Sequence, residues 1–98
     1  MPKYNYYVHI TTNFNKTTLH IGVTNNLGRR LQEHKDSRIE GDSFAGKYHC
    51  YNLVYCEIYE NIGDAIRREK EIKKWRREKK KRLIESQNPE WKFMNGDI

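Results

Sequence analysis

Two short segments of aromatic and β-branched residues, separated by a turn, constrain this chain more than any other feature. Residues 4–10 read YNYYVHI, residues 17–22 read TTLHIG, and residues 13–16 between them read NFNK. Strand-forming segments on either side of such turn residues predict a β-hairpin. The chain is therefore expected to build an antiparallel sheet around this hairpin.

The length of the hairpin loop decides which residues face each other. If residues 13–16 form the loop, Thr12 pairs with Thr17, and His9 lies directly opposite His20. The two imidazoles then share one face of the sheet, with Cβ atoms about 5 Å apart. A polar pair that only stabilises the hairpin and a pair that carries chemistry are both open at this point.

A helix is expected directly after the hairpin. Residues 24–26 (TNN) can cap its first turn, and Leu27 and Leu31 form an apolar pair one turn apart. Arg30 flanks this pair. Residues 36–52 are polar and contain glycines, which is typical of a loop.

The second half of the chain predicts one more strand and two more helices. Residues 53–59 (LVYCEIY) read as a third strand. Helices are expected from Ile62 to Trp75 and from Arg77 to Gln87, where Asn88-Pro89 ends the second. The expected fold class is α/β (α+β), with a small three-stranded antiparallel sheet flanked by about three helices.

The helix that begins at residue 62 carries a carboxylate on its expected buried side. Its apolar stripe comprises Ile62, Ala65, Ile66 and Ile72. Glu69 falls within this stripe, where an unpaired charge is costly. A salt bridge to a nearby arginine and a metal ion are both open as its partner.

The length of 98 residues predicts one domain over residues 1–98, with a core of about 5–92 and a frayed end from Asn95 to Ile98. No segment has the length and hydrophobicity of a signal peptide or a membrane span, so a soluble, cytoplasmic protein is expected. Cys50 and Cys56 do not form a CxxC pair and are expected to be reduced and structural, without a structural zinc ion.

Positive charge is concentrated in one segment. The net charge is +6, and residues 67–82 hold eleven Lys or Arg and three Glu, which leaves a net −2 for all other residues. Such a basic stripe suits a polyanion, because each neutralised phosphate releases counterions. A solvated helix face with opposite-sign pairs is the alternative.

The order of these elements and their motifs resembles the GIY-YIG nuclease superfamily, and in particular its small stand-alone bacterial members. The resemblance covers about residues 5–92. Each fragment is weak alone, but the ordered set with this spacing is specific. The matching fragments are residues 7–9 (YVH), 20–34 (HIGVTNNLGRRLQEH), 47–48 (KY), 65–70 (AIRREK), 75–80 (WRREKK) and 88–91 (NPEW).

The resemblance implies a fold like that of the catalytic modules of some homing endonucleases and of the incising subunit of bacterial nucleotide excision repair. It also implies site residues. The two signature tyrosines of the family fall on His9 and His20, the family arginine on Arg30, the metal-binding glutamate on Glu69 and the family asparagine on Asn88. The implied cofactor is a divalent metal, Mg or Mn, and the implied partner is nucleic acid, with DNA favoured.

Further residues are expected to bind nucleic acid. Three of them, His34, Lys47 and Tyr48, match positions near the site in relatives. The others belong to the basic stripe: Arg68, Lys73, Arg76, Arg77 and Lys80. Tyr48 and Trp75 are candidates for stacking on bases, although core packing is preferred for Trp75.

The chain departs from the family pattern because both signature tyrosines are histidines. Histidine can activate water, since its ordinary pKa of about 6.5 lies nearer neutrality than the value of about 10 for tyrosine. The hypothesis assigns water activation to His9, orientation of water or phosphate to His20, phosphate charge to Arg30 and a divalent cation to Glu69. Alternatively, both imidazoles and Glu69 bind a softer metal such as Zn or Ni.

Three functions remain open from the sequence. The first is a metal-dependent DNA endonuclease, directed by substrate structure and used in repair or recombination. The second is a nucleic-acid-binding module with a degenerate catalytic site. The third is an interaction or metal-sensing protein with an incidental basic helix.

Overall fold

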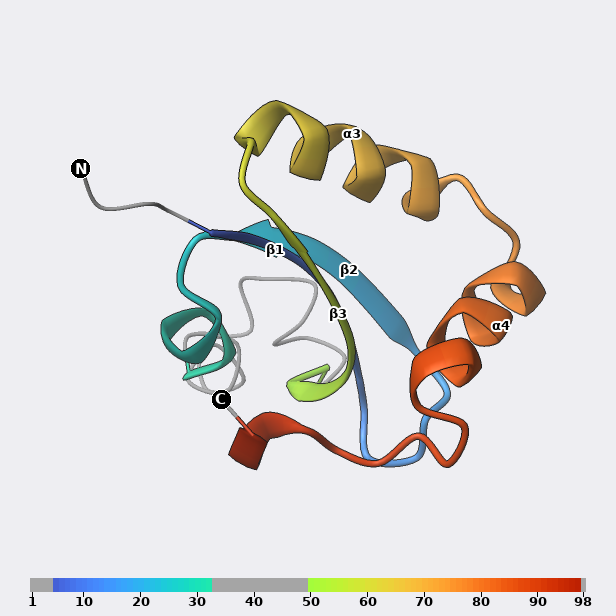
Figure 1. The fold of residues 1–98 in the computed structure, drawn as a ribbon. Coiled ribbons are helices and arrows are strands. Elements are labelled where there is room, and N and C mark those ends of the chain that lie inside the picture. Colours follow the sequence, from blue (N-terminus) through green and yellow to red (C-terminus); the bar gives the residue numbers. More distant parts are fainter. Residues whose placement is uncertain (1–4, 33–49, 98) are drawn as a thin grey trace.

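A computed structural model describes residues 5–32 and 50–97 (Figure 1). Three antiparallel strands form one sheet in the order β2-β1-β3. The predicted fold class is confirmed. The strands are β1 (Tyr6–Thr12), β2 (Leu19–Thr24) and β3 (Asn52–Tyr59), and the helices are a segment over residues 27–32, α3 (Ile62–Lys73), α4 (Arg77–Gln87) and the 3-10 turn η1 (Asn95–Asp97).

The hairpin forms, but its predicted register is wrong by two residues. Thr12 pairs with Leu19 and not with Thr17, so His9 lies opposite Gly22 and His20 lies opposite Thr11. A shift of two residues keeps every side chain on its expected face. His9 and His20 therefore still share one face, as diagonal neighbours.

The side chain of Asn13 explains the longer loop. Its Oδ1 accepts hydrogen bonds from the backbone N–H groups of Thr17 (2.8 Å) and Thr18 (3.0 Å). The hydroxyl of Thr12 donates to the Thr18 carbonyl at 2.7 Å, and Lys16 has a positive φ of 60°. These contacts withdraw residues 17 and 18 from the strand and give a rigid six-residue turn.

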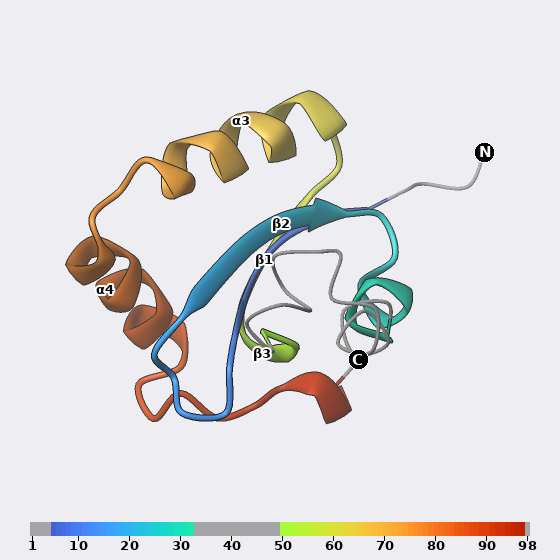
Figure 2. The same cartoon turned by 180° about the vertical axis from the view of Figure 1, so that it is seen from behind.

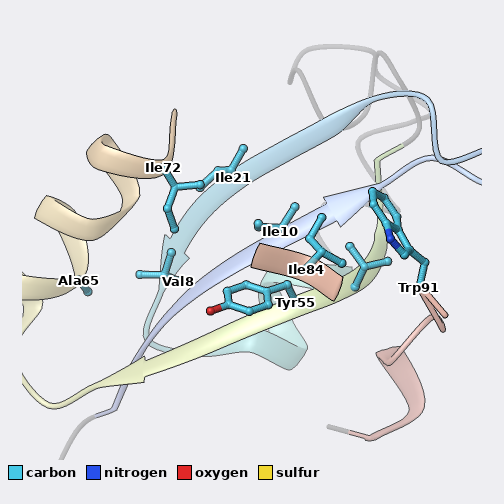
Figure 3. Packing of buried hydrophobic residues seen from close by; sticks show 9 residues of the cluster. Val8, Ile10, Ile21, Tyr55, Ala65, Ile72, Ile84 and Trp91 are labelled. Carbon is cyan, nitrogen blue, oxygen red and sulfur yellow. The ribbon is translucent and has the colours of Figure 1, made fainter. Parts of the chain in front are cut away.

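One face of the sheet packs against α3 and α4 and forms the main core (Figure 3). Ala65 and Ile72 of α3 and Ile84 of α4 lie against alternating residues of β1 and against two consecutive residues of β3, where the pairing with β1 has a bulge. The buried strand and tail residues of this core are Val8, Ile10, Ile21, Val54, Tyr55 and Trp91. We call this the helix-covered face.

The opposite face carries the two histidines and a second, smaller cluster. Leu27 and Leu31 of the segment over residues 27–32 pack with Leu53 of β3. Figure 2 shows this short helix on the other side of the sheet from α3. Asn26 caps the helix, because its Oδ1 accepts the Arg29 N–H at 3.0 Å. We call this the histidine face.

Helix α3 is capped by Asn61, whose side chain accepts the N–H groups of Gly63 and Asp64. Its predicted buried stripe is only half correct. Ala65 and Ile72 are fully buried, whereas Ile62 and Ile66 are 51% and 39% exposed. The helix lies rotated so that Arg68 and Glu69 take part of the sheet-facing side.

The outer edge of β3 is covered by amide side chains from the end of the chain. Gln87 donates to the Cys56 carbonyl, Asn88 donates to the Val54 carbonyl, and Asn95 donates to the Tyr51 carbonyl. Asn95 also accepts the Leu53 N–H at 2.8 Å. Asn95, predicted to lie in a frayed tail, is thus tied to the sheet.

Within the described part of the chain, no helix is long and apolar enough to cross a membrane. The loop predicted over residues 36–52 falls mostly outside the described residues, and its last residue begins β3. Cys50 and Cys56 are free thiols, and burial raises the pKa of each to about 11.

Candidate active site

The two imidazoles converge above Gly22. A Cβ atom added to Gly22 would lie 2.9 Å from Nε2 of His9 and 3.5 Å from Nε2 of His20. The two ring centroids are 6.4 Å apart, and the ring planes are tilted by 57°. The glycine therefore provides the space in which both rings turn an Nε2 edge toward the same point.

Burial distinguishes the two histidines. His9 lies in the central strand and has no exposed surface, whereas His20 lies in an edge strand and is half-buried. Thr11, directly opposite His20, is also fully buried. Its hydroxyl has no hydrogen-bond partner among the described residues.

Arg30 lies in the short helix that follows β2 and packs on the histidine face. Its backbone N–H bonds the Asn26 carbonyl at 3.0 Å, which places it in the first turn of that helix. Leu27 and Leu31, on either side of it in sequence, anchor the helix in the smaller cluster. Arg30 is half-buried, in keeping with its predicted place beside the apolar pair.

Glu69 lies on α3, on the other side of the sheet from the two imidazoles. Its side chain is 19% exposed, and its Oε1 forms an ion pair with Nζ of Lys73 at 3.1 Å. Helix α3 contacts the edge strand β2, and Figure 2 shows the two running side by side. His20 and Glu69 therefore belong to elements that meet along the β2 edge.

The structure does not gather the residues that a soft metal ion would need. Among residues 5–32 and 50–97, no three His, Cys, Asp or Glu side chains are close enough to hold one metal ion. The predicted set of His9, His20 and Glu69 does not form. A Zn or Ni site with these three ligands is therefore not supported.

A polar network that the sequence did not indicate lies on the helix-covered face. The carboxylate of Glu57 accepts hydrogen bonds from Nε and Nη2 of Arg68, each at 3.0 Å to the nearer oxygen. It also accepts the hydroxyls of Tyr55 and, at 2.7 Å, Tyr59. Nη1 of Arg68 donates to Glu71 at 2.5 Å. This network links β3 to α3 beside Glu69.

The network shifts the ionisation of its members. Burial alone would raise the pKa of the Glu57 carboxyl, but hydrogen bonds from Arg68, Tyr55 and Tyr59 outweigh burial and hold that pKa below its ordinary value. Burial and the bond to Glu57 raise the pKa of Tyr59 to about 12. The carboxylate therefore stays charged at neutral pH.

The residues expected to bind nucleic acid differ in their surroundings. Arg68 is committed to Glu57 and lies 5.0 Å from the centroid of the Trp75 ring. Lys73 pairs with Glu69, Arg76 is exposed, and Arg77 donates to the Lys16 carbonyl at 3.0 Å. Lys80 is half-buried. His34, Lys47 and Tyr48 lie outside the described residues.

Trp75 and Asn88 have partners within the fold. Trp75 packs partly on the main core and carries Nζ of Lys79 at 4.2 Å from its ring centroid, in addition to Arg68. Asn88 is buried, and its amide bonds the backbone of Val54 and Lys92. These contacts give both residues an evident role in packing.

The fold and the motifs together match a known family. The model of the GIY-YIG catalytic domain matches residues 5–82. The chain belongs to the GIY-YIG family. The GIY-YIG domain is in general a nuclease domain that acts on nucleic acid with a divalent metal ion.

Several relatives of similar length accompany this family match. The chain is 37% identical over 84 residues to a UPF0213 protein from Syntrophus aciditrophicus (strain SB), across 86% of this chain and 93% of that protein. It is 36% identical over 67 residues to a UPF0213 protein from Staphylococcus aureus (strain Mu3 / ATCC 700698), across 68% of this chain and 79% of that protein.

A solved structure supports the fold. The solution NMR structure of a UPF0213 protein from Bacillus halodurans superposes with a TM-score of 0.56 and 24% sequence identity, over 89% of each chain. The expectation of a small GIY-YIG protein is confirmed.

Sequence reasoning missed two features beside the imidazoles. Thr11 lies two residues after His9 on the same strand, so the alternation of side chains along a strand places both on one face. Gly22 was noted in the motif, but its closeness to His9 depends on the register. The shared face of Thr11 and His9 could thus have been predicted from the strand alone, whereas the position of Gly22 required the correct hairpin pairing.

Proposed function

We propose that this protein is a divalent-metal-dependent endonuclease that hydrolyses phosphodiester bonds in DNA, with a preference for branched or frayed structures. The observation that carries the proposal is the convergence of His9 and His20 above Gly22, at the two positions where the family has tyrosines. The basic segment from residue 67 to residue 82 supplies affinity for the phosphate backbone without base selectivity.

Burial favours a division of roles that reverses the sequence hypothesis. His20 is half-buried on the edge strand, whereas His9 has no exposed surface, so we assign water activation to His20. His9 is fully buried and supports His20 from the central strand. Arg30 stabilises charge on the phosphate, because a guanidinium can contact two phosphate oxygens at once.

Glu69 fits a hard divalent cation such as Mg or Mn. Its carboxylate is partly exposed, and Mg²⁺ is commonly held by one or two carboxylates while it keeps water and phosphate oxygens as its other ligands. A cation held by Glu69 would supply charge stabilisation at a phosphate bound along the β2 edge, where α3 meets the strand that carries His20. Lys73 pairs with Glu69 at 3.1 Å and orients this carboxylate.

A second candidate is a nucleic-acid-binding module without catalysis. The observation that favours it is the complete burial of His9, which keeps one of the two imidazoles away from any substrate. In this candidate, the pair of histidines stabilises the hairpin, and the basic segment alone accounts for function.

Cleavage of labelled single-stranded, duplex and branched DNA with Mg, Mn, Zn or Ni separates the two candidates. We expect cutting of the branched substrate with Mg or Mn. Glu69→Ala and His20→Ala should each lower the rate at least about 100-fold while DNA affinity stays nearly unchanged. Glu78→Ala, which removes an exposed carboxylate from α4, is the matched control and should cut normally.

Two results would contradict this proposal. Salt-sensitive DNA binding without cutting by any metal would favour the binding module. A Glu69→Ala variant that cuts as fast as the parent would remove Glu69 from the site.

A further inference from the structure

Phe14, at the tip of the hairpin, and Phe93, in the segment after α4, form an exposed aromatic pair apart from the histidine face. Phe14 is 80% exposed and Phe93 is 38% exposed. Their ring centroids are 6.2 Å apart in an edge-to-face arrangement, and Nζ of Lys16 lies 5.5 Å from the centroid of Phe93. A phenylalanine this exposed contributes little to the core, so its surface is available to a ligand.

The tip is fixed by hydrogen bonds and lies beside the basic helix α4. Asn13 fixes the turn through its bonds to Thr17 and Thr18, and Arg77 at the start of α4 donates to the Lys16 carbonyl at 3.0 Å. Figure 1 shows the turn next to α4 and to the segment that follows it. The phenyl ring of Phe14 is therefore presented on an ordered turn.

Cations line the hollow between the tip and α4. Lys16, Arg77 and Lys81 contribute positive charge to it, and Glu85 and Glu90 also line it. Glu85 accepts the indole N–H of Trp91 at 3.1 Å, and Glu90 pairs with Lys92 at 3.3 Å. The hollow therefore holds three cations against two carboxylates, one of which pairs with Lys92, and its net charge is positive.

We propose that Phe14 and Phe93 form a platform on which an unpaired nucleobase stacks, chiefly on the more exposed ring of Phe14, while Lys16, Arg77 and Lys81 bind the adjoining phosphates. Nucleobases stack on exposed aromatic rings without regard to sequence, and cations beside the ring bind the backbone. Trp75, one of the two stacking candidates suggested by the sequence, packs partly on the main core and has Arg68 and Lys79 over its ring. The inference rests on the proposed function and specifies its substrate: single-stranded or frayed nucleic acid.

Binding to three labelled ligands tests the platform in the full chain carrying Glu69→Ala. The ligands are a short oligothymidylate, an abasic chain of the same length and a blunt duplex. We expect Phe14→Ala to weaken oligothymidylate binding about tenfold and to leave the abasic chain unaffected. Phe14→Trp should restore binding, and the base should quench the fluorescence of the new indole.

Ile62→Ala is the matched control, because Ile62 is an exposed apolar residue of α3 and should have no effect. Equal oligothymidylate affinity for the parent and Phe14→Ala would overturn the platform and leave the proposed function standing. Self-association that Phe14→Ala abolishes, with unchanged oligothymidylate binding, would assign the ring to a second copy and also overturn it. A parent that binds none of the three ligands at low salt would overturn both proposals.

Discussion

The two faces of the sheet differ in whether their buried polar groups have hydrogen-bond partners. On the helix-covered face, Glu57 is surrounded by donors from Arg68, Tyr55 and Tyr59. On the histidine face, the buried hydroxyl of Thr11 has no hydrogen-bond partner among the described residues. A buried polar group without a partner costs stability, and such groups concentrate where function requires them. The two faces therefore differ in how completely their buried polar groups are satisfied: Glu57 has several donors, and the Thr11 hydroxyl has none among the described residues.

The largest expected effect comes from breaking the network on the helix-covered face. Glu57→Gln should lower the free energy of unfolding by about 3 kcal/mol, because it removes the less exposed of the two carboxylates that pair with Arg68 and leaves only Glu71. Urea denaturation measures the loss. The control Glu78→Gln lies on an exposed helix surface and should change the free energy by less than about 0.5 kcal/mol.

The same carboxylate predicts a pH dependence. The pKa of Glu57 is lower in the folded protein than its ordinary value of 4.5, so its contribution to stability is complete above pH 4.5. That contribution is lost as the pH falls below 4.5 toward the folded pKa. Stability curves of the parent and Glu57→Gln should therefore converge in acid, and curves that stay parallel would refute this assignment.

A smaller effect is expected from the glycine on the histidine face. Gly22→Ala should cost about 2 kcal/mol, because the new Cβ would lie 2.9 Å from Nε2 and 3.0 Å from Cε1 of His9. Gly96→Ala is the control, since no heavy atom lies within 4 Å of the position its Cβ would take. The cost of Gly22→Ala should shrink in a His9→Ala background, and an equal cost in both backgrounds would show that the two residues are not coupled.

The smallest changes in the free energy of unfolding are expected from substitutions of two neighbouring threonines, Thr11 and Thr12. Thr11→Val should raise the free energy of unfolding by about 0.5 to 1 kcal/mol, because it removes a buried hydroxyl that lacks a partner. Thr12→Val should lower it by about 1 kcal/mol, because its hydroxyl donates to the Thr18 carbonyl at 2.7 Å. Thermal unfolding measures both, and a loss of stability in Thr11→Val would remove the contrast between the two faces.

Local sequence patterns predicted most of the fold. The strands and the two long helices follow from alternation, capping residues and the Asn88-Pro89 stop, and these signals act over a few residues. The register of the hairpin did not follow, because Asn13 satisfies the backbone of residues 17 and 18 with its side chain. Turn residues indicate that a loop exists more reliably than they indicate its length.

The candidate site was predicted residue by residue, but its arrangement was not. The motif order pointed to His9, His20, Arg30 and Glu69. Glu69 and the two imidazoles lie on opposite sides of the sheet, and this placement depends on tertiary packing. The partner of Arg68 is Glu57, eleven residues earlier on another element, and local periodicity carries no information about such a pair.

The amide side chains along β3 also affect whether the outer edge of the sheet can pair with another molecule. An outer strand with unsatisfied N–H and C=O groups is a template for pairing with another molecule. Gln87, Asn88 and Asn95 occupy several of those groups between Tyr51 and Cys56 without adding a strand. These three side chains therefore oppose intermolecular β-pairing at the outer edge of β3.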